Sequence, residues 1–187
     1  MEDNDGSSLI EGLFLFSQGK FLEASKFFKE AEEICRKLND NKQLSFIMRF
    51  QADCLMNEGK LKEAMELHKE AGQMFKKLHD NEGLEGCLDS QAKILGQQGK
   101  LEQSIDCLRE REKICKKIGD KECLAFSLFN QGEALFFLGD TSGILLMEKA
   151  LAIANENGFS DAVSLFTKSM KANSIEIKNN KSKWKFW

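Results

Sequence analysis

The chain has 187 residues, of which 42% are hydrophobic and 30% charged, and its formal net charge is −3 at pH 7. This composition is apolar enough for a domain to bury a continuous core, and it excludes general disorder. Proline and tyrosine are absent, while abundant Leu, Lys, Glu, Ala and Phe favour helices. We therefore expect an all-α chain.

Residues 1–7 are acidic and polar, and we expect them to form a flexible N-terminus. They lack the positive region and the apolar core of a secretory signal. No apolar stretch approaches the roughly 20 residues that cross a bilayer. We therefore expect a soluble, cytoplasmic chain without a membrane span.

The six cysteines form no C-x-x-C pair, and only two histidines accompany them. This pattern does not indicate a zinc site or any other metal site. We expect reduced, structural thiols in a cytosolic setting.

Glycine and aspartate recur along the chain with a step of 40 residues, at Gly19, Gly59, Gly99 and Gly139 and at Asp40, Asp80 and Asp120. A period of this length indicates repeated supersecondary units that stack into a solenoid. We place four units within residues 8–158, at about 8–38, 41–78, 81–118 and 121–157.

Each unit is predicted to be a helical hairpin. In the second unit, an apolar periodic segment ends at Gly59, which can adopt the positive φ that closes a helix, and another begins at Leu61. Between units, Asp40, Asp80 and Asp120 can accept hydrogen bonds from the free amides of the next helix.

Small and large residues recur at positions that lie between the two helices of a hairpin. In the second unit they are Ala52, Leu55, Ala64, His68 and Ala71; the first has Gly12, Leu15, Ala24, Phe28 and Ala31, and the third has Ala92, Leu95, Ser104, Leu108 and Arg111. Arg111 departs from this pattern. The fourth hairpin is one residue shorter between its glycines, and Ala150 fits the late alanine position only after that deletion.

Residues 160–173 are predicted to form an amphipathic capping helix that covers the last hairpin with Val163, Leu165, Phe166 and Met170. The tail, residues 174–187, is basic and aromatic. Its Trp184, Phe186 and Trp187 could touch an anionic membrane or nucleic acid, remain frayed, or dock. We favour docking in cis or on a second copy, and we expect no nucleic acid partner.

No nucleotide-binding, metalloprotease or hydrolase motif occurs in the context that its chemistry requires. His68 occupies a packing position and His79 a turn, so neither resembles a positioned base. We expect no enzyme activity, no catalytic residue and no cofactor.

These repeated landmarks resemble the tetratricopeptide repeat (TPR) family, in particular its 40-residue subclass in spindle-orientation adaptors, kinesin light chains and bacterial arrays. The resemblance implies a right-handed α-α superhelix of four hairpins and a cap. It also implies a non-catalytic scaffold that binds a peptide or helix of a partner protein in a concave groove. The alternative is an oligomerisation module whose aromatic tail contacts another copy.

By this resemblance, the first helix of each unit lines the groove. The implied ligand-reading residues are Arg49, Asp53, Met56, Asp89, Lys93, Gln97, Phe126, Phe129, Asn130, Glu133 and Phe136. Asp53 and Glu133 oppose the family's clamp for a terminal carboxylate, so a ligand with a basic centre and hydrophobic anchors fits better. The aromatic residues could equally pack on the capping helix.

Overall fold

The computed structural model describes residues 6–183, and for residues 174–183 it describes the backbone alone. This part of the chain contains helices and no strand, which confirms the all-α prediction. The helices are α1 (Ser7–Ser17), α2 (Phe21–Leu38), α3 (Asn41–Asn57), α4 (Leu61–Lys77), α5 (Asn81–Gln97), α6 (Leu101–Ile118), α7 (Lys121–Phe137), α8 (Ser142–Glu156) and α9 (Ser160–Lys183). Trp184, Phe186 and Trp187 lie outside the described residues, so the predicted tail contacts stay predictions.

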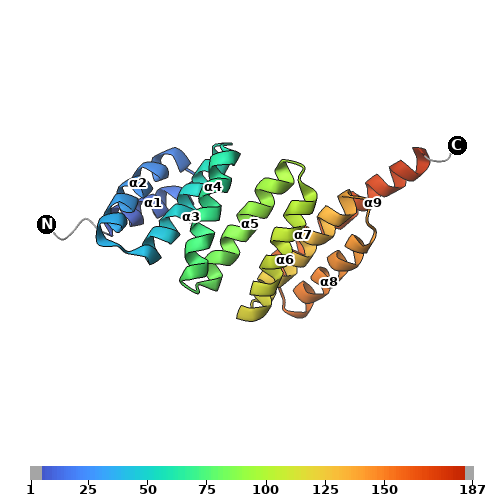
Figure 1. The fold of residues 1–187 in the computed structure, drawn as a ribbon. Helices are drawn as coiled ribbons and strands as arrows, with labels where there is room; N and C mark the ends of the chain where they lie inside the picture. The colour runs from blue at the N-terminus through green and yellow to red at the C-terminus, as the bar shows by residue number, and fades with distance from the viewer. Residues whose placement is uncertain (1–5, 184–187) are drawn as a thin grey trace. The chain divides into compact units, whose positions relative to one another are not determined.

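The helices group into two compact units, Met1–Lys100 with α1 to α5 and Leu101–Trp187 with α6 to α9. Within each unit, every helix packs against the next one along the chain (Figure 1). In the first unit, α3 also contacts α5, the first helix of the next repeat. Contacts between neighbouring repeats therefore involve first helices as well as second ones.

The turns follow the predicted chemistry. Gly59 adopts a φ of +79° after α3, and the next amide, that of Lys60, donates to the carbonyl of Leu55 at 2.9 Å. A residue with a side chain would be strained at such a φ, which explains why glycine recurs at this position. The helix reversal is thus encoded locally.

The aspartates between the hairpins are N-caps, as predicted. Asp40 accepts hydrogen bonds from the amides of Lys42 and Gln43, Asp80 accepts one from Gly83, and Asp120 accepts one from Cys123. Each carboxylate satisfies amides that have no partner within the helix. The caps fix where α3, α5 and α7 begin.

The core of the first unit is built from the predicted interhelical positions. Ala24, Ala64 and Ala71 are buried, with large side chains such as Phe28 and Ile47 around them. The small residues allow the helix axes to approach, while the large ones fill the space between hairpins.

The second unit has its own core beneath α9. Phe166 of α9 is fully buried, and its ring stacks on Phe129 of α7 with centroids 4.1 Å apart. Met147 and Ala150 of α8 are buried at positions that match Phe28 and Ala31 once the deletion is taken into account. Helix α9 therefore covers the last hairpin, and it continues to Lys183, beyond the predicted end of the cap.

Cys115 and Cys123 form a disulfide, so the expectation of reduced thiols is wrong for this pair. Position pairs 40 and 80 residues earlier are also in contact: Cys35 with Gln43, and the ring of Phe75 against Gly83. The late position of one hairpin thus meets the third residue of the next helix at these three junctions. Only in the last of these junctions are both residues cysteines.

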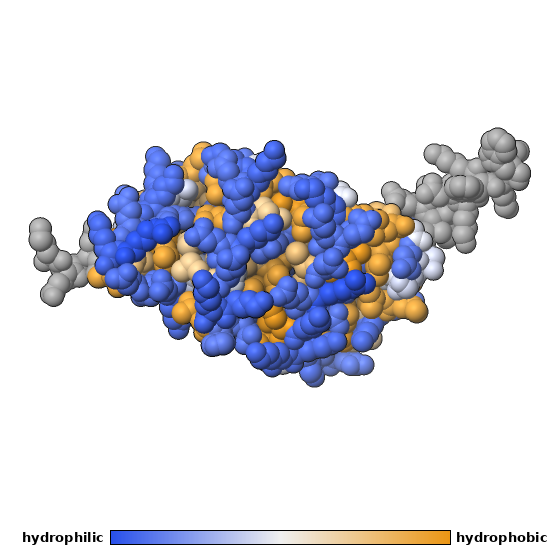
Figure 2. Space-filling view, viewed as in Figure 1, coloured by the Kyte–Doolittle hydropathy of each residue, from blue (hydrophilic) through white to orange (hydrophobic). Residues whose placement is uncertain are grey.

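The face shown in Figure 2 is mostly hydrophilic, with hydrophobic side chains exposed between hydrophilic ones. On α1, Ile10 and Phe14 are 69% and 57% exposed. None of the helices in the described part of the chain has both the length and the apolarity of a membrane-spanning segment.

Candidate functional site

Arg49 and Asp53 lie one helical turn apart on α3, and both project toward α5. The guanidinium carbon of Arg49 is 4.8 Å from the ring centre of Phe50 and 5.7 Å from that of Phe46. Both distances are within the range of cation–π attraction. The arginine head therefore lies over two aromatic rings.

Gly86 of α5 provides the space for this arginine. A Cβ at Gly86 would lie 2.5 Å from Nη1 of Arg49, closer than two such atoms can approach. The equivalent residues 40 positions before and after are Phe46 and Phe126. We call Arg49 together with Phe46, Phe50 and Gly86 the Arg49 cradle.

The guanidinium in this cradle forms no hydrogen bond and no ion pair with any other described residue, and its Nε is buried without a partner. A buried donor without an acceptor costs about 1–3 kcal/mol. The arrangement is therefore unusual for a side chain with only a structural role.

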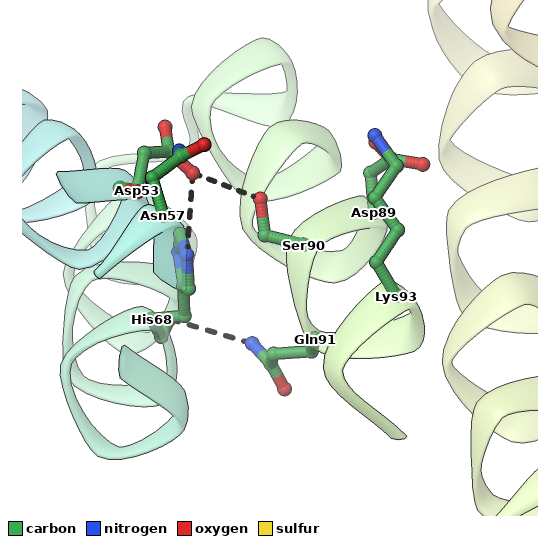
Figure 3. Close-up of polar contacts among 7 residues, drawn as sticks. All are labelled: Asp53, Asn57, His68, Asp89, Ser90, Gln91 and Lys93. Atoms are coloured by element: carbon green, nitrogen blue, oxygen red, sulfur yellow. Dashed lines mark hydrogen bonds and ion pairs between the residues drawn. The ribbon is translucent and has the colours of Figure 1, made fainter. Parts of the chain in front are cut away.

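Asp53 is held by contacts from two other helices (Figure 3). Ser90 of α5 donates a hydrogen bond to its Oδ1 at 3.1 Å, and Nε2 of His68 on α4 lies 3.3 Å from the same oxygen. The Asn57 amide donates to the backbone carbonyl of Asp53. The carboxylate is thus oriented, while its second oxygen has no protein donor among the described residues.

His68 is completely buried. Gln91 donates to its backbone carbonyl at 3.3 Å, but neither ring nitrogen makes a hydrogen bond of good geometry with a described residue. The equivalent residues in the other repeats are the hydrophobic Phe28, Leu108 and Met147. A polar side chain at an otherwise apolar position marks a local departure from the repeat pattern.

Asp89 and Lys93 form an ion pair at 2.6 Å on α5. Figure 3 shows both side chains on the side of α5 that is turned away from Asp53. Of the other predicted residues in this unit, Met56 is half-buried on α3 and Gln97 is exposed at the end of α5. The structure therefore brings Arg49 and Asp53 to one surface and places Asp89 and Lys93 on another.

The predicted residues of α7 lie largely under α9. Phe129 is 2% exposed in its stack with Phe166. The ring of Phe126 meets the ring of Phe166 edge-on, with the two ring centres 5.1 Å apart. Ser169 of α9 donates a hydrogen bond to Glu133. Phe126 and Phe129 thus follow the packing alternative, in which the aromatic residues stabilise the cap.

The remaining α7 residues are partly accessible. Phe136 packs at the edge of the second core, and Asn130 is half-buried. The predicted role of these two side chains in reading a ligand stays a prediction.

Gly86 and Ser90 were not predicted from the sequence to belong to a site, and His68 was predicted to serve packing alone. The available signal was the alignment of repeats. Gly86 stands where two phenylalanines occur, and His68 where three hydrophobic residues occur. Such departures from the repeat pattern are visible in the sequence. Which of these residues lie close together in space depends on the contact of α3 with α5.

The order of groups in this network does not suit nucleophilic catalysis. In a serine triad the histidine lies between the hydroxyl and the carboxylate and removes the hydroxyl proton. Here Asp53 lies between His68 and Ser90. Burial raises the pKa of the neighbouring Cys54 and Cys87 thiols to about 12, so they are protonated at neutral pH. The geometry orients a carboxylate rather than activating a nucleophile.

No model of a protein family matches the sequence, and no curated protein is significantly similar to it. Solved structures do share its fold. A Rap protein complexed with competence and sporulation factor is 19% identical with a TM-score of 0.75, and the match covers 94% of this chain and 49% of that protein. The chain thus spans about half the length of this neighbour.

Two further structures are similar over most of this chain. A signal-transduction ATPase with a TPR sensor from Pyrococcus horikoshii is 21% identical with a TM-score of 0.81, and the match covers 97% of this chain and 28% of that protein. Nearly identical TPR-like repeats of the kinesin light chain type from Podospora anserina are 16% identical with a TM-score of 0.69, covering 96% and 99% respectively. The chain therefore has the helical-hairpin solenoid fold of TPR proteins, as the resemblance implied.

Proposed function

We propose that this chain is a non-catalytic protein-interaction scaffold that binds a peptide or helix of a partner protein on the surface formed by α3 and α5. The observation that carries the proposal is the pairing of two oriented charges on this surface. Asp53 is fixed by Ser90 and His68, and Arg49 is fixed by aromatic rings, yet both retain polar atoms without a partner among the described residues.

Aromatic side chains beside these charges support the same reading. The ring centre of Phe16 on α1 lies 5.2 Å from that of Phe50, and the ring centre of Phe46 lies 4.7 Å from that of Phe50. All three rings are half-buried. Partly exposed aromatic residues around an oriented arginine are typical of the anchors that dominate protein interfaces.

The fold is compatible with this proposal. Helical solenoids generally use their extended surfaces for binding, although fold alone does not define function. One of the structural neighbours is complexed with competence and sporulation factor. Binding of a peptide by the present chain is inferred from its own surface.

The proposal is tested by selecting binders from a random peptide library with the full chain and mapping the best one by amide chemical shifts. We expect the largest shifts on α3 and α5, including the amides of Phe50 and Ser90. Shifts confined to α9, or the failure of any peptide to bind, would contradict the proposal.

Self-association is a second candidate function, favoured by the exposed face of α1. Ile10 and Phe14 are highly exposed, whereas Cys54, which is equivalent to Phe14 in the next repeat, is fully buried. A second copy could cover this face or bind through Trp184, Phe186 and Trp187. Solution mass across a concentration series, measured for the full chain and for Phe14→Gln, separates association through the face of α1 from association through the tail. A monomer at all concentrations rejects this function.

The proposed location is the cytoplasm. There the four cysteines outside the disulfide would stay reduced, and the Cys115–Cys123 pair would be one that reduction can open. Trapping thiols with an alkylating reagent at the moment of cell lysis tests this location, because a fully oxidised pair would indicate an oxidising compartment.

A further inference from the structure

We infer that the partner segment is acidic, and that an Asp or Glu side chain of this segment binds the guanidinium of Arg49. This inference rests on the proposed function. It reverses the charge expected from the sequence, where Asp53 and Glu133 suggested a ligand with a basic centre.

The acidic residues of the predicted groove are already engaged within the chain. Asp53 accepts from Ser90 and contacts His68, and Asp89 pairs with Lys93. In the second unit, Glu133 accepts from Ser169. A basic ligand would therefore share each of these carboxylates with an internal partner.

Arg49 is the opposite case. It forms no ion pair or hydrogen bond with another described residue, although Asp53 lies only one turn away on the same helix. The carboxylate of Asp53 is directed to Ser90 and His68, while the guanidinium is held against Phe50 and Phe46. The two charges on α3 are thus separated by their surroundings, and the cation is left for an external anion.

The cradle also prepares Arg49 for a planar anion. Contact with two aromatic rings restricts the guanidinium, so little further side-chain entropy is lost when a carboxylate binds. Carboxylates match the spacing of two guanidinium N–H groups, and such charge-assisted pairs are about twice as strong as neutral hydrogen bonds. The half-buried rings of Phe16 and Phe46 provide apolar contact beside this point, so the expected segment combines an acidic residue with hydrophobic neighbours.

The experiment is a selection from a library of random 16-residue peptides whose C-termini are joined to the display carrier, so that no terminal carboxylate is free. The baits are the full chain, Arg49→Met, which keeps an apolar stem, and Arg109→Met as the matched control. Arg109 is an exposed arginine of α6 that pairs with the exposed Asp106. Circular dichroism verifies that each bait is folded.

We expect an excess of Asp and Glu among peptides selected by the full chain and by Arg109→Met, and loss of that excess with Arg49→Met. The best peptide, synthesised with a fluorescent label and an amidated C-terminus, should bind Arg49→Met about ten-fold more weakly or worse. Its Glu→Gln version should show a similar loss with the full chain. Binding that requires a free terminal carboxylate in place of the acidic side chain would overturn the inference.

Gly86→Ala supplies a second test that preserves both charge and fold. Alanine favours a helix more than glycine does, but its Cβ would displace the end of the flexible Arg49 side chain. We expect the labelled acidic peptide to bind this variant several-fold more weakly. Unchanged binding would show that only net charge matters and would reject the cradle.

The other outcomes separate the two proposals. Selected peptides that show no acidic excess, or are enriched in Lys and Arg, overturn the acidic-partner inference and leave the scaffold function standing. An acidic excess that persists with Arg49→Met also overturns it. If none of the baits selects any peptide, the proposed function fails and the inference fails with it.

Discussion

Gly132 of α7 and Gly143 of α8 meet backbone to backbone. A Cβ at Gly132 would lie 2.5 Å from the carbonyl oxygen of Gly143, and a Cβ at Gly143 would lie 2.3 Å from the carbonyl oxygen of Gly132. The equivalent residues in the second repeat are Ala52 and Ala64, both fully buried. The one-residue deletion before Gly143 is thus accompanied by a closer approach of these two helices.

This contact predicts that Gly132→Ala and Gly143→Ala destabilise the chain by about 1–3 kcal/mol, even though alanine favours a helix. The obstacle is backbone, which cannot rotate away. Gly72→Ala is the matched control, because its Cβ would meet Cys87 at an ordinary 3.5 Å. We expect that variant to gain about 0.5–1 kcal/mol. The free energies of unfolding of the three variants are compared by urea unfolding. Equal changes in all three would contradict the close backbone contact of α7 with α8.

The disulfide between Cys115 and Cys123 predicts a definite thiol count. Under denaturing, non-reducing conditions we expect four reactive thiols, and six after reduction. In the chain-entropy description, a loop this short contributes about 2–3 kcal/mol. Reduction should therefore lower the unfolding midpoint of the wild type and leave Cys115→Ser/Cys123→Ser unaffected. Six thiols before reduction would mean that the pair is not bonded.

His68 predicts a gain in stability on replacement by a hydrophobic residue. In His68→Leu, two buried ring nitrogens without good hydrogen bonds are removed, while Asp53 keeps its bond from Ser90. We expect the free energy of unfolding to rise by about 1 kcal/mol or more. The reciprocal Leu108→His at the equivalent position should lower it. A loss of stability in His68→Leu would show that the contact with Asp53 is net favourable.

The fold was predictable because its determinants are local and repeated. Gly59 closes a helix through its own φ, and Asp80 caps the next helix through its own side chain, so both could be identified from spacing. The cap was predictable from the apolar pattern around Phe166. Each of these features depends on residues close together in the sequence.

The candidate site was only partly predictable because it depends on contacts between repeats. Arg49 and Asp53 were identified by their position on a first helix. Their partners Gly86 and Ser90 lie more than 30 residues further on, and nothing local distinguishes them. The charge of the proposed ligand changed for the same reason: the sequence shows Asp53 as an acid, but it does not show which side chains already satisfy it.

Glu112 of α6 predicts a pH dependence of stability. Burial raises its pKa, but hydrogen bonds from Lys116 and Gln131 outweigh burial, and the pKa of this carboxyl lies below its usual value. A carboxylate whose pKa is lowered by folding stabilises the folded state above its unfolded pKa. This contribution is lost as the pH falls through the folded pKa, below about 4.5.

We therefore expect Glu112→Gln to lose less stability than the wild type when urea unfolding is compared at pH 6 and pH 3. The wild type releases the bonds from Lys116 and Gln131 on protonation, whereas a neutral glutamine has no charge to lose. Glu110→Gln, at an exposed position on the same helix, is the control and should follow the wild type. If all three chains lose the same stability, the charge of Glu112 does not contribute to the packing of α6 on α7.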